Sequence, residues 1–211
     1  DYHGPVLEFE PDDAERAPAR PVDADKATDF GSALHRACEW LALQPQSPDE
    51  TMVQTALERI GRAYAIKDTV RLADAFSRWR ASDLCARALA FAYHQPEVPF
   101  CTCVAHEYLE GEIDLLCSDG PTPAGGHAFI VDYKTGGSDA ESADALAEKH
   151  LLQAQCYAFA AMKSGFESVE LHFVRVERDD AEHPGQPHIV DYRFGISDLN
   201  ALEQTVSSAR I

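Results

Sequence analysis

The 211-residue sequence lacks the marks of a secreted, membrane-bound or zinc-ribbon protein. Its six cysteines include no CxxC pair, so neither a zinc ribbon nor an iron–sulfur cluster is indicated. No stretch approaches the roughly 18–20 continuous apolar residues that a membrane helix needs. The N-terminus, "DYHGPVLEFEPDD", has neither the basic start nor the apolar centre of a signal peptide. We therefore expect a cytoplasmic protein with reduced cysteines and no membrane partner.

Basic residues are also scarce, because 18 lysines and arginines stand against 36 acidic residues, for a net charge of -18. This balance argues against general adhesion to nucleic acid, so a substrate that contains phosphate must be held locally. Residues 58–87 differ, with seven bases and four acids. They could contact phosphates, although ordinary solvated helix faces are the simpler interpretation. No GxxxxGK[ST] loop is present, so this chain alone does not hold nucleotide as a P-loop motor would.

Composition and periodicity divide the chain into a lead segment and one domain. Residues 1–30 carry nine acids and three bases together with Pro11, Pro18 and Pro21. We interpret residues 1–29 as an acidic linker or lead segment of a longer chain, and residues 30–211 as the domain. Apolar residues at helical spacing predict a helix over residues 30–43 and a helical insert over about residues 48–93.

A strand-like alternation begins near Val98 and continues, with one helical interruption, to the final helix. The stretch "VPFCTCVAHEYLEGEIDLLCS" predicts two strands that turn near residues 108–111, and "AFIVDYKT" predicts a third. A helix over about residues 140–163, strands at "SVELHFVRVE" and "HIVDYRFG", and a helix after Ser197 follow. This order predicts an α/β protein whose mixed sheet, with the functional site, spans about residues 97–193.

Charged residues lie inside two of the predicted strands, where burial is costly unless the charge has a partner. In "GEIDLL", alternation places Ile113 and Leu115 on one face and Asp114 on the other. In "FIVDYKTG", Asp132 and Lys134 share a face. If these strands pair, Asp114 can come opposite Asp132, and two close carboxylates repel each other unless a divalent cation lies between them.

The chemistry of such a site suits phosphodiester hydrolysis. Hard oxygen ligands favour Mg2+ or Mn2+ over zinc, and such an ion binds a phosphate oxygen and lowers the pKa of a bound water. Lys134 fits as a fixed positive charge beside the phosphate in the transition state. A D-x-K pattern alone is equally compatible with a strand-surface ion pair of Asp132 and Lys134.

Further motifs decide between these interpretations. The chain contains "GSALHRACEW", "EVPF", "GEIDLL", "VDYKTG" and "QAQCY" in this order, over about residues 30–161. Together they resemble the G-x-x-x-H helix, the sheet-opening segment, the G-x-I-D-L and D-Y-K-[ST] strands and the Q-x-x-x-Y helix of the PD-(D/E)XK nuclease superfamily. The resemblance is specifically to the RecB/AddA-type exonuclease V nuclease domain at the C-terminus of helicase-nuclease subunits. It implies a restriction-endonuclease-like core of order αβββαβ with a helical insert.

The resemblance also implies roles for individual residues. They are metal ligation by His35, Asp114, Asp132 and the main-chain carbonyl of Tyr133, and catalysis by Asp114, Asp132, Lys134, Gln153 and Tyr157. Positions four apart share a helix face, so Gln153 and Tyr157 project together; the alternative is an ordinary amphipathic helix. A lone helical histidine such as His35 is also compatible with a boundary position. Glu97 is either an acid of the metal site or a surface or capping residue.

The expected function is a divalent-metal-dependent DNA exonuclease that acts on single-stranded ends during double-strand-break repair. The resemblance implies two kinds of partner, namely helicase domains upstream in the same chain and a second helicase-nuclease subunit. Two alternatives stay open at this point. One is a catalytically silent nuclease-like fold that serves as a scaffold or clamps DNA ends, and the other is a stand-alone nuclease that acts on RNA or another DNA structure.

Overall fold

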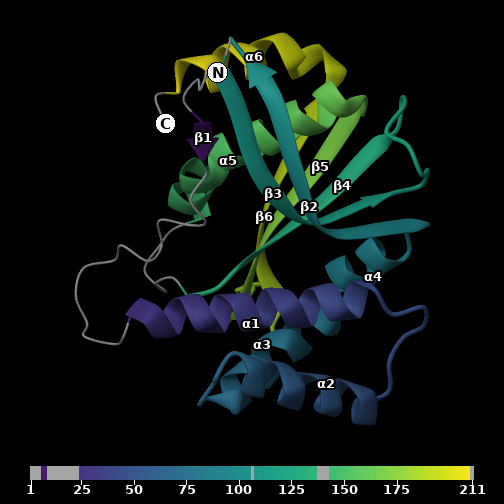
Figure 1. The fold of residues 1–211 in the computed structure, drawn as a ribbon, viewed down its shortest axis with the longest axis vertical. Coiled ribbons are helices and arrows are strands. Elements are labelled where there is room, and N and C mark those ends of the chain that lie inside the picture. Colours follow the sequence, from purple (N-terminus) through teal and green to yellow (C-terminus); the bar gives the residue numbers. More distant parts are fainter. Residues whose placement is uncertain (1–5, 9–23, 106, 137–142, 210–211) are drawn as a thin grey trace, which may run out of the picture.

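A mixed β-sheet lies between two groups of helices in the computed structural model, which describes residues 6–8, 24–105, 107–136 and 143–209 (Figure 1). The strands are β1 (Val6–Glu8), β2 (Tyr93–Val104), β3 (Glu107–Ser118), β4 (His127–Lys134), β5 (Ser168–Asp179) and β6 (Pro187–Gly195). The helices are α1 (Ala24–Ala42), α2 (Glu50–Ala63), α3 (Thr69–Arg80), α4 (Asp83–Leu89), α5 (Ala143–Ser164) and α6 (Leu199–Ser208), with a 3-10 turn, η2 (Ile196–Asp198), before α6. Among the described residues, no helix combines the length and apolar character needed to cross a membrane.

The strand order confirms the predicted α/β fold with a restriction-endonuclease-like core. The sheet runs β1-β3-β4-β5-β6, with β2 paired to β3. Strands β2, β3 and β4 pair antiparallel, β4 and β5 pair parallel across α5, and β6 returns antiparallel to β5. The order from α1 through β2, β3, β4 and α5 to β5 is therefore the predicted helix, three strands, helix, strand, and α2–α4 form the helical insert.

The hairpin between β2 and β3 turns earlier than the sequence suggested. A turn near residues 108–111 is wrong, because Tyr108 pairs with Cys103 and Gly111 pairs with Phe100 inside the ladder. The register continues to the pair Val104 and Glu107, so the chain turns directly after Val104. Gly111 suggested a turn, but it is a strand residue that faces an aromatic ring.

Two apolar cores lie on opposite faces of the sheet. One is formed by the sheet with α1 to α4, and the other by the sheet with α5 and α6. Helix α1 buries Phe30, Leu34, Cys38 and Leu41 at spacings of three and four residues, which gives it one continuous apolar face. Full burial of one large apolar side chain contributes roughly 1.5–3 kcal/mol.

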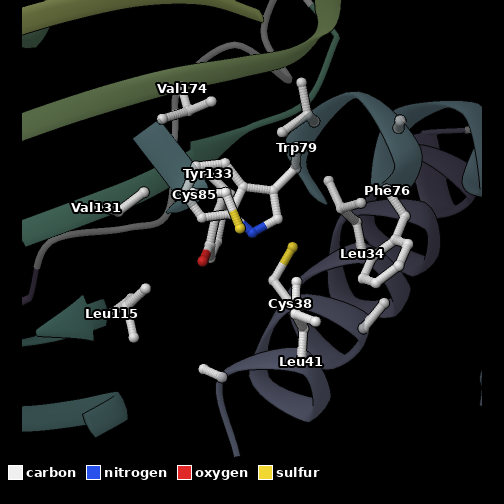
Figure 2. Packing of buried hydrophobic residues seen from close by; sticks show 14 of the residues in the cluster. Leu34, Cys38, Leu41, Phe76, Trp79, Cys85, Leu115, Val131, Tyr133 and Val174 are labelled. Atoms are coloured by element: carbon white, nitrogen blue, oxygen red, sulfur yellow. The ribbon is translucent and has the colours of Figure 1, made fainter. Parts of the chain in front are cut away.

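Tyr133 connects the first core to the functional strand β4. Its ring packs edge-on against Trp79 with the ring centroids 5.1 Å apart, as Figure 2 shows among the surrounding residues. Tyr133 is buried on the face opposite Lys134, as the alternation in "FIVDYKTG" predicted. The helices of the insert therefore support the strand that carries the candidate catalytic residues.

Ion pairs fasten the helical insert to β5. Arg71 pairs with Glu177, Arg78 with Asp179 and Arg87 with Glu170, while Arg80 pairs with Glu50 inside the insert. Four of the seven bases in residues 58–87 therefore lie beside acidic partners. These contacts give the basic segment a structural role that the sequence pattern did not reveal.

The predicted lead segment, residues 1–29, contains parts of two described elements. Helix α1 begins at Ala24 rather than at Phe30, and β1 pairs in parallel with β3. The three prolines and most of the acidic residues that defined the segment lie at positions 9–23, outside the described residues. Helix α5 begins at Ala143, close to the predicted start near residue 140.

Candidate active site

The site forms where β3 and β4 cease to pair. Their ladder contains Leu115 with Val131 as its last pair toward the site, and its continuation would place Asp114 opposite Asp132, as predicted. The Asp114 carboxylate instead accepts a hydrogen bond from the backbone N–H of Tyr133, with Oδ2 2.7 Å from the nitrogen. The side chain thus takes the place of a ladder hydrogen bond and lies buried between the two strands.

This departure from the ladder also changes the alternation in β3. Ile113 belongs to the core beside α5 and α6, whereas Leu115 belongs to the core beside α1 to α4. The prediction that Ile113 and Leu115 share a face is wrong, because the pleat is interrupted at Asp114. That interruption turns the Asp114 carboxylate toward β4 instead of toward one face of the sheet.

A hydrogen-bonded network joins β4 to helix α5. Lys134 Nζ donates to Gln153 Oε1 at 3.1 Å, and Gln153 Nε2 lies 3.2 Å from Asp132 Oδ2. The Tyr157 hydroxyl lies 3.1 Å from the same Asp132 oxygen and 2.9 Å from the carbonyl oxygen of Glu112 on β3. Gln153 and Tyr157 are 2.9 Å apart at their polar ends. The four residues of the D-x-K and Q-x-x-x-Y motifs therefore meet in one place.

The two carboxylate oxygens of Asp132 differ in their surroundings. Oδ2 is engaged by Gln153 and Tyr157, whereas Oδ1 is buried without a hydrogen bond among the described residues. Lys134 Nζ lies 3.1 Å from Oδ1 and forms an ion pair with it. Asp132 and Lys134 are only 3% and 7% exposed, so the strand-surface ion pair considered from the sequence does not describe them.

His35 reaches the same strand from α1. Its Nε2 lies 3.1 Å from the carbonyl oxygen of Tyr133, and its Nδ1 lies 3.5 Å from Asp114 Oδ1. A carbonyl oxygen can only accept, so Nε2 carries a proton in this arrangement. The G-x-x-x-H helix and the D-Y-K-[ST] strand are therefore in direct contact at the two groups, His35 and the Tyr133 carbonyl, that the resemblance nominated as ligands.

Glu97 completes a set of three groups that could hold a metal ion. Ligand atoms of His35, Glu97 and Asp114 all lie within 4.8 Å of one another. Glu97 lies on β2 between Pro96 and Val98, which pair with Leu115 and Ile113 of β3. Glu97 therefore lies beside Asp114 of β3. Its φ of 51° is in the left-handed region that non-glycine residues rarely adopt. Asp132 is not a member of this set; its Oδ2 contacts Gln153 and Tyr157, and its Oδ1 pairs with Lys134.

The close carboxylates shift one another's protonation. Burial and the neighbouring Asp132 raise the pKa of Asp114 to about 7. Burial, a hydrogen bond with Glu112 and the charge of Asp114 raise the pKa of Glu97 to about 8. Burial alone would lower the pKa of His35, but the charges of Asp114, Asp132 and Glu97 raise it above its usual value. The site therefore holds protons near neutral pH that a cation would have to displace.

The donor set fits a divalent cation of the hard type. The 3.1 Å between His35 Nε2 and the Tyr133 carbonyl oxygen is a hydrogen-bond distance, and a cation held by both atoms would take the place of the proton on Nε2. Asp132 Oδ1 adds a buried oxygen without a hydrogen bond. Carboxylate and carbonyl oxygens with a single imidazole suit a hard divalent cation.

Phe100 explains why a glycine stands in "GEIDLL". A Cβ atom built on Gly111 would lie 2.6 Å from the Phe100 ring on the paired strand. The same ring meets Tyr157 edge-on with centroids 5.8 Å apart. The segments "EVPF", "GEIDLL" and "QAQCY" are therefore packed together through Phe100, Gly111 and Tyr157, and this contact supports the Tyr157 hydroxyl.

Replacing Gly111 with alanine should lower the free energy of unfolding by about 1–3 kcal/mol, because the new methyl group displaces the Phe100 ring from Tyr157. The result runs against the usual preference, since alanine normally stabilises a strand relative to glycine. Urea unfolding measures the change, and Gly120→Ala in the loop after β3 is the control, expected within about 0.5 kcal/mol of the wild type. A Gly111→Ala protein as stable as the wild type would disprove the contact.

The fold and the site together define a nuclease of the restriction-endonuclease-like class. The chain belongs to the PD-(D/E)XK nuclease superfamily, whose family model matches residues 7–209. Membership indicates a nuclease that uses divalent metal ions. No curated protein matches the chain. A solved structure titled "Crystal structure of SSO0001" is 16% identical over 85% of this chain and 71% of that chain, with a TM-score of 0.35.

Proposed function

We propose that the chain is a DNA exonuclease domain of the RecB/AddA type, which hydrolyses phosphodiester bonds at single-stranded ends with Mg2+ or Mn2+. The observation that carries the proposal is the joint geometry of two groups of side chains. Asp132, Lys134, Gln153 and Tyr157 form one buried network. His35, Glu97 and Asp114 bring their ligand atoms within 4.8 Å of one another, and His35 and Asp114 both contact the Tyr133 backbone of the same strand.

The residues of the chain have distinct tasks in this proposal. A divalent cation held by His35, Glu97 and Asp114, with the Tyr133 carbonyl and Asp132 Oδ1 as further ligands, would neutralise phosphate charge and acidify a water. Lys134 supplies a fixed positive charge that is desolvated and therefore acts strongly on an attacking water and on the phosphate. Gln153 and Tyr157 hold Asp132 in place, since both contact its Oδ2.

The net charge supports a setting in which another part of a larger assembly delivers the strand. With a charge of -18, an isolated domain repels a polyanionic substrate. Helicase domains of the same longer chain, and a second helicase-nuclease subunit, would bring single-stranded DNA to the site. This setting belongs to double-strand-break repair and has its support in the motif resemblance.

Cleavage of end-labelled DNA tests the proposal. The protein is incubated with linear single-stranded DNA, circular single-stranded DNA, duplex DNA and RNA, each with Mg2+, Mn2+ or a chelator. We expect metal-dependent loss of linear single strands and little attack on circles. Asp132→Ala should reduce the rate roughly 1000-fold, equivalent to about 4 kcal/mol, because it removes a buried site oxygen and the partner of Lys134.

Asp119→Ala, at an exposed carboxylate just beyond β3, is the matched control and should leave the rate unchanged. Cleavage that survives Asp132→Ala would contradict the site assignment. Attack on RNA at the rate of DNA would favour a stand-alone ribonuclease. Metal binding by calorimetry without any cleavage, even at high DNA concentration, would favour a scaffold or end-binding role.

A further inference from the structure

Strand β4 stops pairing with β5, its neighbour on the side away from β3, immediately after Lys134. The parallel ladder with β5 ends at the pair Lys134 and Arg175. Two residues later, the backbone N–H of Gly136 donates to Oε2 of Glu177 at 2.7 Å. Gly136 has a φ of 70°, so the chain bends here in a conformation that favours glycine. The Glu177 carboxylate thus accepts a backbone hydrogen bond where the ladder with β5 ends, as the Asp114 carboxylate does where the ladder with β3 ends.

Glu177 is itself held by the helical insert. Arg71 of α3 donates from Nε to Oε1 at 2.5 Å and from Nη2 to Oε2 at 2.9 Å, which is a bidentate pair. The guanidinium lies over the ring of Phe30 at 3.8 Å from its centroid, so Arg71 also contacts α1. Burial would raise the pKa of Glu177, but Arg71 and the Gly136 N–H lower it below its usual value, so the carboxylate stays charged at neutral pH.

We propose that Glu177 and Arg71 are positioning residues that fix the end of β4 and thereby the Lys134 side chain. The backbone N–H groups of Tyr133 and Gly136 flank Lys134, and each is held by a carboxylate where a sheet ladder ends. Glu177 contacts this part of the chain at the Gly136 backbone N–H, so its effect on Lys134 passes through the backbone. This inference rests on the proposed nuclease function.

A neighbouring ion pair provides a matched comparison within the same two elements. Arg78 lies seven residues after Arg71 on α3, and Asp179 lies two residues after Glu177 on β5. Their side chains pair at 2.6 Å, as Arg71 and Glu177 pair at 2.5 Å. Both pairs fasten α3 to β5, but only Glu177 also binds the backbone beyond Lys134. Loss of a contact between α3 and β5 should be felt in variants of either pair, whereas displacement of the end of β4 should occur only in variants of Glu177 and Arg71.

Steady-state cleavage under the conditions above gives kcat and KM for each variant. Glu177→Ala and Arg71→Met should each lower kcat roughly 10–100-fold, with KM and Mn2+ affinity within about 3-fold of the wild type, because displacement of Lys134 affects the chemical step. The double variant should lose little more than either single one, since the two residues act as a unit. Glu177→Gln keeps an oxygen acceptor for Gly136 and should recover most of the rate. Asp179→Asn should leave kcat unchanged.

Hydrogen exchange separates this inference from the proposed function. In the intact protein the Gly136 amide should exchange roughly 10-fold faster or more in Glu177→Ala than in the wild type, and at the wild-type rate in Asp179→Asn. That comparison needs no cleavage, so it tests the hydrogen bond between Gly136 and Glu177 even if the wild type proves inactive. An unchanged kcat in Glu177→Ala, an equal loss in Asp179→Asn, or unchanged exchange at Gly136 would each overturn the proposal.

Discussion

Replacing Lys134 with methionine should lower single-turnover cleavage roughly 100–1000-fold and leave the affinity for Mn2+ within about 3-fold of the wild-type value. Methionine keeps most of the buried volume and removes only the charge. The Lys134 ammonium lies 3.1 Å from Asp132 Oδ1 and 3.1 Å from Gln153 Oε1 in a site that is almost closed to water. A charge fixed in such surroundings acts more strongly on a developing negative charge than a solvated one does.

The size of the effect distinguishes catalysis from packing. Lys163→Met, at an exposed lysine in the last turn of α5, is the control and should leave the rate unchanged. If Lys134→Met lowered the melting temperature sharply but retained the cleavage rate below its transition, Lys134 would be a structural partner of Asp132 alone. A parallel loss of Mn2+ affinity would instead show that the variant disturbs the metal site, which the Lys134 assignment does not allow.

The sequence supplied the order of the elements and most of the candidate site, for identifiable reasons. A period of two residues in "FIVDYKTG" places Asp132 and Lys134 together regardless of the rest of the fold. Spacing of four residues does the same for Gln153 and Tyr157 on a helix. These local rules hold because regular backbone geometry fixes side-chain direction. His35 required the motif resemblance, since one histidine on a helix has no such geometric signal.

The features that could not be predicted all depend on where regular pairing stops. The interrupted pleat at Asp114, the capture of the Tyr133 N–H and the left-handed φ of Glu97 arise from a register that the sequence does not contain. Glu97 became a member of the candidate metal set only once β2 was seen beside β3. The role of Arg71 and Glu177 was likewise hidden, because these residues lie 106 positions apart.

Replacing Asp114 with asparagine should abolish metal-dependent cleavage and yet stabilise the metal-free protein at alkaline pH. Asparagine can still accept the hydrogen bond from the Tyr133 N–H through its amide oxygen. It removes the charge that conflicts with Asp132 and Glu97 in a buried setting. We expect cleavage to fall roughly 1000-fold, because the metal set loses its central carboxylate. We also expect the melting temperature at pH 8.5 to rise by about 2–4 °C, which corresponds to roughly 1 kcal/mol.

The sign of the pH dependence follows from the raised pKa values. Asp114 has a pKa of about 7 in the folded chain against 3.8 in the unfolded reference, and Glu97 has about 8 against 4.5. The contribution of such a carboxyl group to stability is fully present below its unfolded pKa and declines as the pH rises, until the pH has passed its folded pKa of about 7 or 8. The advantage of Asp114→Asn should therefore be smaller at pH 5.5 than at pH 8.5, where it reaches its full size.

Metal binding should offset the loss of stability at high pH in the wild type but not in Asp114→Asn. Because a cation binds the ionised carboxylates, Mn2+ should raise the melting temperature of the wild type more at pH 8.5 than at pH 5.5. Asp114→Asn should gain little from Mn2+ at either pH. Thermal unfolding of both proteins, with Mn2+ or with chelator at the two pH values, gives all four comparisons. If Mn2+ stabilised Asp114→Asn as strongly as the wild type, Asp114 would not be a metal ligand. Metal binding would then not explain why the carboxylates lie so close together.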